Sequence, residues 1–309
     1  MKTILNWTFF LFFLLIGCGH TQNIPSEVVE TQADDLWQNI RTPIIPKILD
    51  FAGETVPMEY FDVKEALTRE LTIICYWHAS SMYITKLSNR FFPIIEPILQ
   101  REGVPNDFKY LCVAESGLQQ VVSPAKATGF WQFLENTGKE YGLEINSEVD
   151  ERYHIEKSTV AACAYLKKAH KRYGSWTMAA AAYNMGSGGL DKQVGLQKQN
   201  SYYDLLLPEE TMRYIFRILA FKTVMSDLET YGFFIQPEEM FPPLSWKDVS
   251  VADSVESWPD FAKKHGTNYK MLRYFNPWLR DPALVNKAKK TYTVKVPTSG
   301  FRSKVTDSQ

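Results

Sequence analysis

Residues 108–118 read FKYLCVAESGL, and their spacing predicts a helix that turns a carboxyl group toward the protein interior. Four of these residues share one helical stripe, because they follow one another at intervals of three, one and three: Phe108, Leu111, Cys112 and Glu115. The stripe is apolar except for Glu115. The stretch therefore predicts an acid among apolar neighbours.

Burial of an unpaired carboxylate is costly, and the usual response is a raised pKa that keeps the group protonated near neutral pH. A protonated carboxylic acid in a cleft can donate its proton to a leaving group. Glu115 is therefore our candidate catalytic acid. The alternative is that Glu115 lies at the edge of the stripe and forms a structural ion pair.

The composition favours an ordinary globular chain of about two domains. Its 309 residues are 45% hydrophobic and 14% aromatic, which suffices for a substantial core. The formal net charge of -1 gives no support for a nucleic-acid partner. Cys75, Cys112 and Cys163 stand in apolar helical contexts without zinc-site spacing, so we expect buried thiols, no metal and no cofactor.

Residues 1–18 are predicted to be a targeting segment. Lys2 is followed by an apolar run over residues 7–16 that is too short to span a membrane. The end of the segment, LIGC at residues 15–18, resembles the lipobox of bacterial lipoproteins, which implies lipid modification of Cys18. Gly19, where an Asp would resemble an inner-membrane retention signal, favours the periplasmic face of the outer membrane. The alternatives are an uncleaved anchor or a plain signal peptide.

The next residues predict a tether and then helices. Residues 19–45 are polar and form the expected tether, and 46–104 form an N-terminal helical segment. Within it, residues 65–87 predict one long helix, whereas Pro93 and Pro97 interrupt the apolar run 91–99. Further helices are predicted at three places: 159–173, 176–183 and 209–223.

Two polar positions stand out beside irregular backbone. Gln132 lies among large aromatic residues after Gly129, and a polar amide there needs a backbone or ligand partner unless it faces solvent. Tyr183 and Asn184 lie at a predicted helix end before Gly186, Gly188 and Gly189, which predict a flexible loop. The alternative there is a core Tyr and an Asn that caps the helix.

A composition change at Tyr231 predicts a linker over residues 231–243, with Pro237, Pro242 and Pro243. Residues 244–300 then predict a small α+β module, and 301–309 a tail. The predicted order in the module is strand, helix, helix and strand: 246–251, 258–265, 269–274 and 292–296.

Four ordered motifs resemble one family: ES at 115–116, GFWQ at 129–132, AYNMG at 182–186 and EETMRY at 209–214. The set is similar to the soluble-lytic-transglycosylase (goose-lysozyme-like) domain, and most closely to the membrane-bound lytic murein transglycosylase D group. Phe130 and Met185 depart from the family pattern and affect the shape of the expected groove. The resemblance implies a lysozyme-like helical catalytic domain over 105–230.

The C-terminal module resembles LysM, a βααβ fold associated with glycans that contain N-acetylglucosamine. The matching residues are VADS at 251–254, FAKKHG at 261–266, Leu272 and NPW at 276–278, with Ala252 in place of the usual Gly. The fold class expected is therefore mainly α, with a small α+β module at the C-terminus.

The family resemblance implies non-hydrolytic cleavage of the β-1,4 bond between N-acetylmuramic acid and N-acetylglucosamine, with 1,6-anhydro-muramic ends as products. By correspondence, Glu115 is the acid and base and Tyr214 orients it. Four further residues would contact sugar: Ser116, Gln132, Tyr183 and Asn184. The expected partners are peptidoglycan glycan strands and, through Cys18, a membrane; we expect a monomer.

Two other functions stay open from the sequence. A lysozyme-type hydrolase would need a second carboxylate, for which Asp150, Glu151 and Glu156 are available. A non-catalytic, glycan-binding cell-wall lipoprotein would use the LysM-like module alone.

Overall fold

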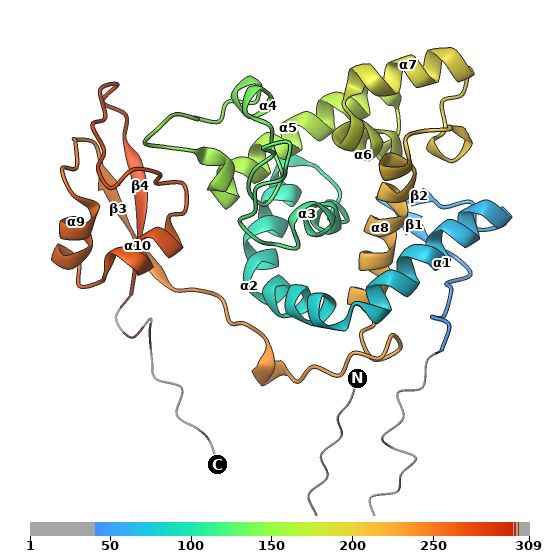
Figure 1. Ribbon diagram of the computed structural model, residues 1–309, viewed down its shortest axis with the longest axis horizontal. Helices are drawn as coiled ribbons and strands as arrows, with labels where there is room; N and C mark the ends of the chain where they lie inside the picture. The colour runs from blue at the N-terminus through green and yellow to red at the C-terminus, as the bar shows by residue number, and fades with distance from the viewer. Residues whose placement is uncertain (1–40, 299, 301, 303–309) are drawn as a thin grey trace, which may run out of the picture. The chain divides into compact units, whose positions relative to one another are not determined.

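The computed structural model describes residues 41–298, 300 and 302 (Figure 1). The predicted signal peptide, Cys18 and most of the predicted tether lie outside the described residues. Within the described part of the chain, no helix has the length and apolar character that crossing a membrane requires.

The fold is mainly helical, as the sequence predicts. Two short antiparallel strands, β1 (Asp50–Phe51) and β2 (Glu54–Thr55), come first. The helices that follow are α1 (Phe61–Tyr76), α2 (His78–Glu102), α3 (Phe108–Ser116), α4 (Glu135–Glu140), α5 (Ile155–Tyr173), α6 (Trp176–Met185), α7 (Ser187–Gln197) and α8 (Glu209–Ser226). Short 3-10 helices also occur in the described part of the chain: η2 (Glu151–Tyr153), η3 (Tyr202–Asp204) and η4 (Pro237–Glu239).

The first two long helices are divided differently from the prediction. The expected helix over 65–87 breaks at Trp77, where α1 ends and α2 begins. In contrast, α2 continues through Pro93 and Pro97. Both prolines are exposed and lie four residues apart, so they share the solvent face of α2. Water can hydrogen-bond the carbonyl groups that the prolines leave without a donor, which explains why the helix continues.

The predicted flexible loop after Asn184 is mostly helical. Gly186 ends α6 with a φ of 80°, as a glycine can, but α7 begins at the next residue. Gly188 and Gly189 therefore lie inside a helix. Leu190 of α7 is fully buried, and this tertiary contact outweighs the low helix propensity of the two glycines.

The short helix α3 is drawn in the middle of the helical domain in Figure 1 and packs against α8 and α2. Its residues Phe108, Leu111 and Cys112 are fully buried, which confirms the apolar stripe. Burial of such side chains contributes about 1.5–3 kcal/mol each. The three cysteines of the described chain are free and buried, as expected.

The C-terminal module has the predicted βααβ order. Strands β3 (Trp246–Val251) and β4 (Tyr292–Pro297) pair antiparallel, and α9 (Trp258–Lys264) and α10 (Tyr269–Phe275) lie between them in sequence. Val149 and Tyr153 of the helical domain join the core of the module. The Asp150 amide donates to the Trp278 carbonyl at 2.9 Å, and the Arg280 amide donates to Glu148 at 2.8 Å. Backbone hydrogen bonds thus attach the module to the segment before α5.

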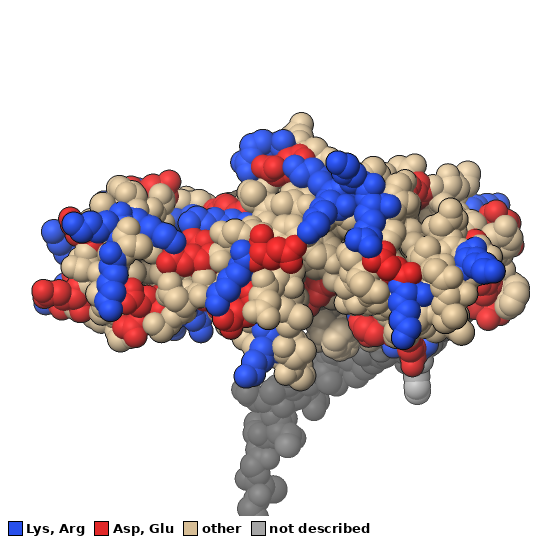
Figure 2. Space-filling model, turned by 90° about the horizontal axis from the view of Figure 1, so that it is seen from above, with Lys and Arg blue, Asp and Glu red and all other residues tan. Residues whose placement is uncertain are grey.

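Charged side chains of both signs are interspersed on the surface that Figure 2 shows. Lys and Arg side chains lie beside Asp and Glu side chains, with uncharged residues between them. This pattern agrees with the formal net charge of -1.

Candidate active site

Glu115 lies in the last turn of α3, one turn beyond the buried Cys112. The side chain is half-buried, and burial raises the pKa of its carboxyl to about 7. A hydrogen bond from Tyr214 and the charge of Arg217 lower this pKa, but by less than burial raises it. The carboxyl is therefore protonated in a large share of molecules at neutral pH, as the sequence predicts for a general acid.

The Tyr214 hydroxyl donates a hydrogen bond to Oε1 of Glu115. Tyr214 is fully buried on α8, and its pKa lies well above the ordinary value because of burial and the nearby Glu115. The hydroxyl thus remains a donor near neutral pH. The two residues are 99 positions apart in the chain and meet because α3 packs on α8.

Two hollows meet at Glu115. The α1–α2 hollow, of about 740 Å³, is lined by α1, the start of α2, α3 and α8, and includes the exposed Trp77 and Tyr83. The α6 hollow, of about 610 Å³, is lined by Gln132, Tyr183, Asn184 and Tyr214, among others. Ala114, Glu115 and Arg217 line both hollows, so we treat them as one groove with Glu115 in its wall.

Gln132 lines the α6 hollow in a loop of unusual backbone. Its φ is +48°, and its Nε2 donates to the carbonyls of Gly129 at 2.8 Å and Val121 at 3.1 Å. The amide nitrogen therefore holds the loop, and the amide oxygen has no intramolecular donor among the described residues. The adjacent Trp131 is fully buried and donates from Nε1 to Thr159 at 2.8 Å, which anchors this loop on α5.

Tyr183 and Asn184 also line the α6 hollow, from the end of α6. The Tyr183 hydroxyl donates to the Trp131 carbonyl at 2.7 Å, and its ring packs edge-on against Phe133. The Asn184 Oδ1 accepts from Thr211 at 2.8 Å. Both residues are half-buried. Both residues thus line the hollow and also make structural contacts, but Asn184 does not cap the helix, because it lies inside α6 and the C-cap is Gly186.

Ser116 lies apart from the other predicted sugar contacts. It is buried, its hydroxyl donates to the Cys112 carbonyl at 3.2 Å, and it lines the α1–α2 hollow. The structure thus places Ser116 on the other side of Glu115 from Gln132, Tyr183 and Asn184.

An ion-pair network in the groove was not predicted from the sequence. Glu70 of α1 is 1% exposed and pairs with Arg213 at 2.6 Å and with Arg217 at 3.7 Å. Arg217 also pairs with Glu210 at 2.9 Å. The helical spacing of Tyr214 and Arg217, three residues apart, is a sequence signal that places both on the Glu115 side of α8.

Among the described residues, no three His, Cys, Asp or Glu side chains lie close enough to hold a metal ion. The second carboxylates considered for hydrolysis lie away from the groove. Asp150 pairs with Arg152 at 2.7 Å, Glu151 with Lys157, and Glu156 with Lys295.

Comparison with known proteins identifies both domains. Residues 92–206 match the transglycosylase SLT domain, and residues 247–300 match the soluble lytic transglycosylase C-terminal LysM-like domain. The chain is similar to membrane-bound lytic murein transglycosylase D from Escherichia coli strains K12 and O6:H1, with 25% identity over 293 residues in each case. These matches cover 88% of this chain and 63% of each relative, so the chain spans less than two thirds of their length.

A putative tributyltin chloride resistance protein from Alteromonas sp. strain M-1 is 28% identical over 116 residues, which is 35% of this chain and 56% of that protein.

The matched SLT domain contains Glu115, Ser116, Gln132, Tyr183 and Asn184, whereas Tyr214 lies beyond its end. The chain thus contains a region that matches the transglycosylase SLT domain, followed by a region that matches the LysM-like domain, and it is similar to membrane-bound lytic murein transglycosylase D over 88% of its length.

Proposed function

We propose that this protein is a peptidoglycan lytic transglycosylase that cleaves the β-1,4 bond between N-acetylmuramic acid and N-acetylglucosamine without water. The observation that carries the proposal is the state of the groove carboxyls. Three described residues with carboxyl groups line the groove, and Glu70 and Glu210 are each paired with arginine. Glu115 instead accepts a hydrogen bond from the neutral hydroxyl of Tyr214, and its carboxyl has a pKa of about 7.

The proposed reaction uses Glu115 twice. The protonated carboxyl first donates its proton to the glycosidic oxygen as the C1–O bond breaks and positive charge develops at C1. The resulting carboxylate then accepts the proton of the muramic C6 hydroxyl, while the C6 oxygen forms the new bond to C1. Such an internal nucleophile has an effective concentration of ~10⁵ M or more in well-oriented cases. The ring closure yields the 1,6-anhydro end and returns Glu115 to the protonated form.

The groove residues have distinct proposed roles. Tyr214 would orient the carboxyl of Glu115, and Gln132 would use its amide oxygen toward a sugar hydroxyl or acetamido group. Tyr183 and Asn184 would shape the same side of the groove, and Ser116 the other. We propose 105–230 as the catalytic domain, with 46–104 packed on it, 231–243 as linker and 244–300 as the glycan-associated module.

Product analysis tests the proposed reaction directly. Digestion of purified sacculi should release muropeptides with 1,6-anhydro ends, which are one water lighter than the reducing ends that a hydrolase produces. Reducing ends alone would replace the proposal with a lysozyme-type hydrolase. Binding to sacculi without release of any sugar would instead indicate a non-catalytic wall-binding protein.

Replacement of Tyr214 by Phe should lower the cleavage rate about tenfold or more, because a hydrogen bond to a charged or ionising group is worth about 1.5–3 kcal/mol. The loss of the donor should also raise the pKa of Glu115 and move the alkaline limb of the pH–rate profile upward, since this hydrogen bond lowers that pKa. Rates at several pH values measure both effects.

The matched control is Tyr202→Phe. Tyr202 is buried, and its hydroxyl donates to the carbonyls of Thr211 and Met212 on α8 without contact to Glu115. This variant should lose stability but keep the wild-type pH–rate profile. Equal unfolding midpoints of wild type and Tyr214→Phe together with unchanged activity would count against the role of Tyr214.

We further propose that Cys18 is lipidated and that the protein is a monomer held at the periplasmic face of the outer membrane. The support is the lipobox-like LIGC at residues 15–18 and the membrane-bound names of the relatives. In a bacterial host with lipoprotein processing, the full chain should fractionate with membranes, whereas Cys18→Ser should be released by a salt wash. Membrane retention of Cys18→Ser equal to wild type would contradict the lipid anchor.

A further inference from the structure

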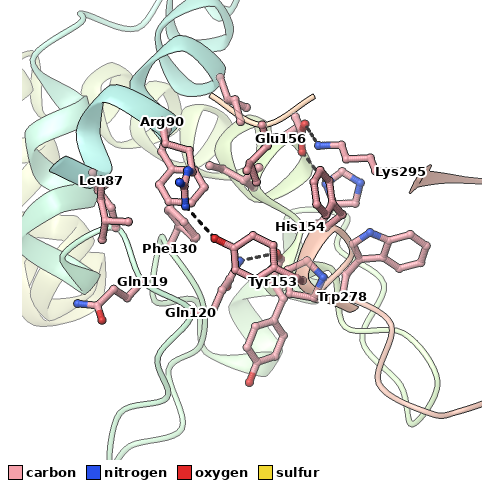
Figure 3. A pocket seen from close by; sticks show the side chains of 18 of the residues that line it. Leu87, Arg90, Gln119, Gln120, Phe130, Tyr153, His154, Glu156, Trp278 and Lys295 are labelled. Atoms are coloured by element: carbon pink, nitrogen blue, oxygen red, sulfur yellow. Dashed lines mark hydrogen bonds and ion pairs between the residues drawn. The ribbon is translucent and has the colours of Figure 1, made fainter. Parts of the chain in front are cut away.

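A second cavity lies outside the groove, where the helical domain meets the C-terminal module (Figure 3). We call it the module pocket; its volume is about 450 Å³. Arg90 and Phe91 of α2 line one side, and Trp246, Tyr274 and Trp278 of the C-terminal module line the other. The pocket therefore requires both domains.

The module pocket adjoins the groove. Tyr83, Gln119 and Val121 line both the pocket and the α1–α2 hollow. Tyr83 and Gln119 are exposed, so these shared residues form an open border. A branched ligand bound along the groove could thus extend a branch into the pocket.

Most charges that line the pocket are already paired. Lys295 forms an ion pair with Glu156, and Nδ1 of His154 lies 3.1 Å from the same carboxylate (Figure 3). Although burial by itself raises the pKa of Glu156, the adjacent His154 and the charge of Lys295 lower it to about 2. Glu156 therefore remains ionised near neutral pH and keeps Lys295 occupied.

Arg90 is different, because no carboxylate of the described residues pairs with it. Its Nη1 donates to the Tyr274 hydroxyl at 2.8 Å and its Nε donates to the Pro242 carbonyl at 3.0 Å. These neutral acceptors orient the guanidinium without neutralising it, and Figure 3 shows Arg90 at the wall of the pocket. A half-buried, oriented guanidinium is well suited to a carboxylate, which it can bind through two hydrogen bonds.

The pocket thus has apolar and aromatic walls and one positive charge, that of Arg90, which no carboxylate of the described residues compensates. Glycan hydroxyls do not compensate such a charge. Each muramic acid of a peptidoglycan strand, however, can carry a peptide stem with alkyl side chains and carboxylates. We propose that the module pocket binds the peptide stem of a strand held in the groove, with Arg90 pairing to a stem carboxylate. This inference rests on the proposed function, and it assigns the C-terminal module a share in substrate selection.

The test measures binding without turnover, in the Glu115→Gln background. Soluble glycan strands that carry stems are compared with strands from which an amidase has removed the stems. Glu115→Gln should bind the stem-bearing strands about tenfold more tightly, the size of effect that one charge-assisted pair supplies. Addition of Arg90→Gln should reduce the ratio of the two affinities to about one. Arg90→Lys, which keeps the charge but not the fork, should restore part of the ratio.

Arg101→Gln is the matched control, because Arg101 is an exposed residue of the same helix that pairs with Glu102. It should keep the tenfold ratio. Tyr274→Phe removes the hydroxyl that orients Arg90, and it should therefore also lower the ratio of the two affinities. Because Tyr274 is exposed, this variant should fold and keeps the test possible even if Arg90→Gln does not fold.

Several results would overturn the assignment: equal affinity of Glu115→Gln for both kinds of strand, absence of binding to either, or an equal loss for both kinds when Arg90 is replaced. A failure of the proposed function shows elsewhere, as wild-type protein that releases no anhydro ends from sacculi. The two failures are distinguishable because the binding assay does not depend on catalysis.

Discussion

We expect Glu115→Gln to lower the release of 1,6-anhydro ends from sacculi by about 10³-fold or more, because the variant can neither donate nor accept the proton of the proposed reaction. The fold should persist, since Gln has nearly the shape of a protonated Glu and its Oε1 can accept the Tyr214 hydrogen bond. Chromatography and mass spectrometry of released muropeptides measure the loss.

Glu135→Gln is the matched control for this variant. Glu135 is an exposed residue that pairs with Lys139 and does not line the groove, so its replacement should leave product release near the wild-type rate. Normal product release by Glu115→Gln would refute the assignment of the catalytic acid.

Glu115→Gln should also reveal how much free energy of unfolding the burial of the Glu115 carboxyl costs. In the folded protein its pKa is about 7, compared with an ordinary value of 4.5. Between these values the unfolded chain loses the proton while the folded chain retains it, so wild-type stability falls as pH rises through this window. Gln does not titrate. The stability of Glu115→Gln relative to wild type should therefore increase by roughly 3 kcal/mol between pH 4 and pH 8.

Urea unfolding of both proteins at the two pH values measures this difference. A relative stability that does not change with pH would show that Glu115 is ionised in the folded protein, and it would remove the basis for a general acid.

Gly129→Ala should lower the free energy of unfolding by about 3 kcal/mol or more and abolish most activity. The φ of Gly129 is +82°, and a Cβ at this position would lie 2.1 Å from the Arg152 carbonyl oxygen. The Cβ is fixed in place by the backbone of residue 129, and the Arg152 oxygen belongs to the backbone, so neither atom can move away without a backbone shift. The loop must shift, and with it Gln132, whose side chain donates to the Gly129 carbonyl.

Gly142→Ala separates the two causes of that loss of stability, which are the left-handed backbone conformation and the steric contact with Arg152. Gly142 has a similar φ of +85°, but an added Cβ would meet no atom within 4 Å. It should cost only the left-handed conformation, about 1–2 kcal/mol. If urea unfolding gave both variants the same loss, the steric contact with Arg152 would not be the reason for glycine at position 129.

Comparison of prediction and structure shows where local patterns suffice. The stripe on α3 and the order of elements in the C-terminal module follow from spacing within a few residues, and both predictions are confirmed. Local patterns failed at Pro93 and Pro97, whose effect depends on which face of α2 meets solvent. They also failed at Gly188 and Gly189, where burial of Leu190 stabilises a helix that propensity disfavours.

The amino-acid sequence alone therefore predicted the apolar stripe that leads to Glu115 and the order of elements in the C-terminal module, because both depend on residues that are near one another in the chain. The pairing of Tyr214 with Glu115 was expected only from the family resemblance, and the other long-range contacts were found only in the tertiary structure. The Tyr214 hydrogen bond, the Glu70–Arg217 pair and the pocket between Arg90 and Tyr274 join residues that lie 99, 147 and 184 positions apart in the chain. Contacts of this kind form when helices pack, and no local spacing rule specifies which side chains the packing brings together.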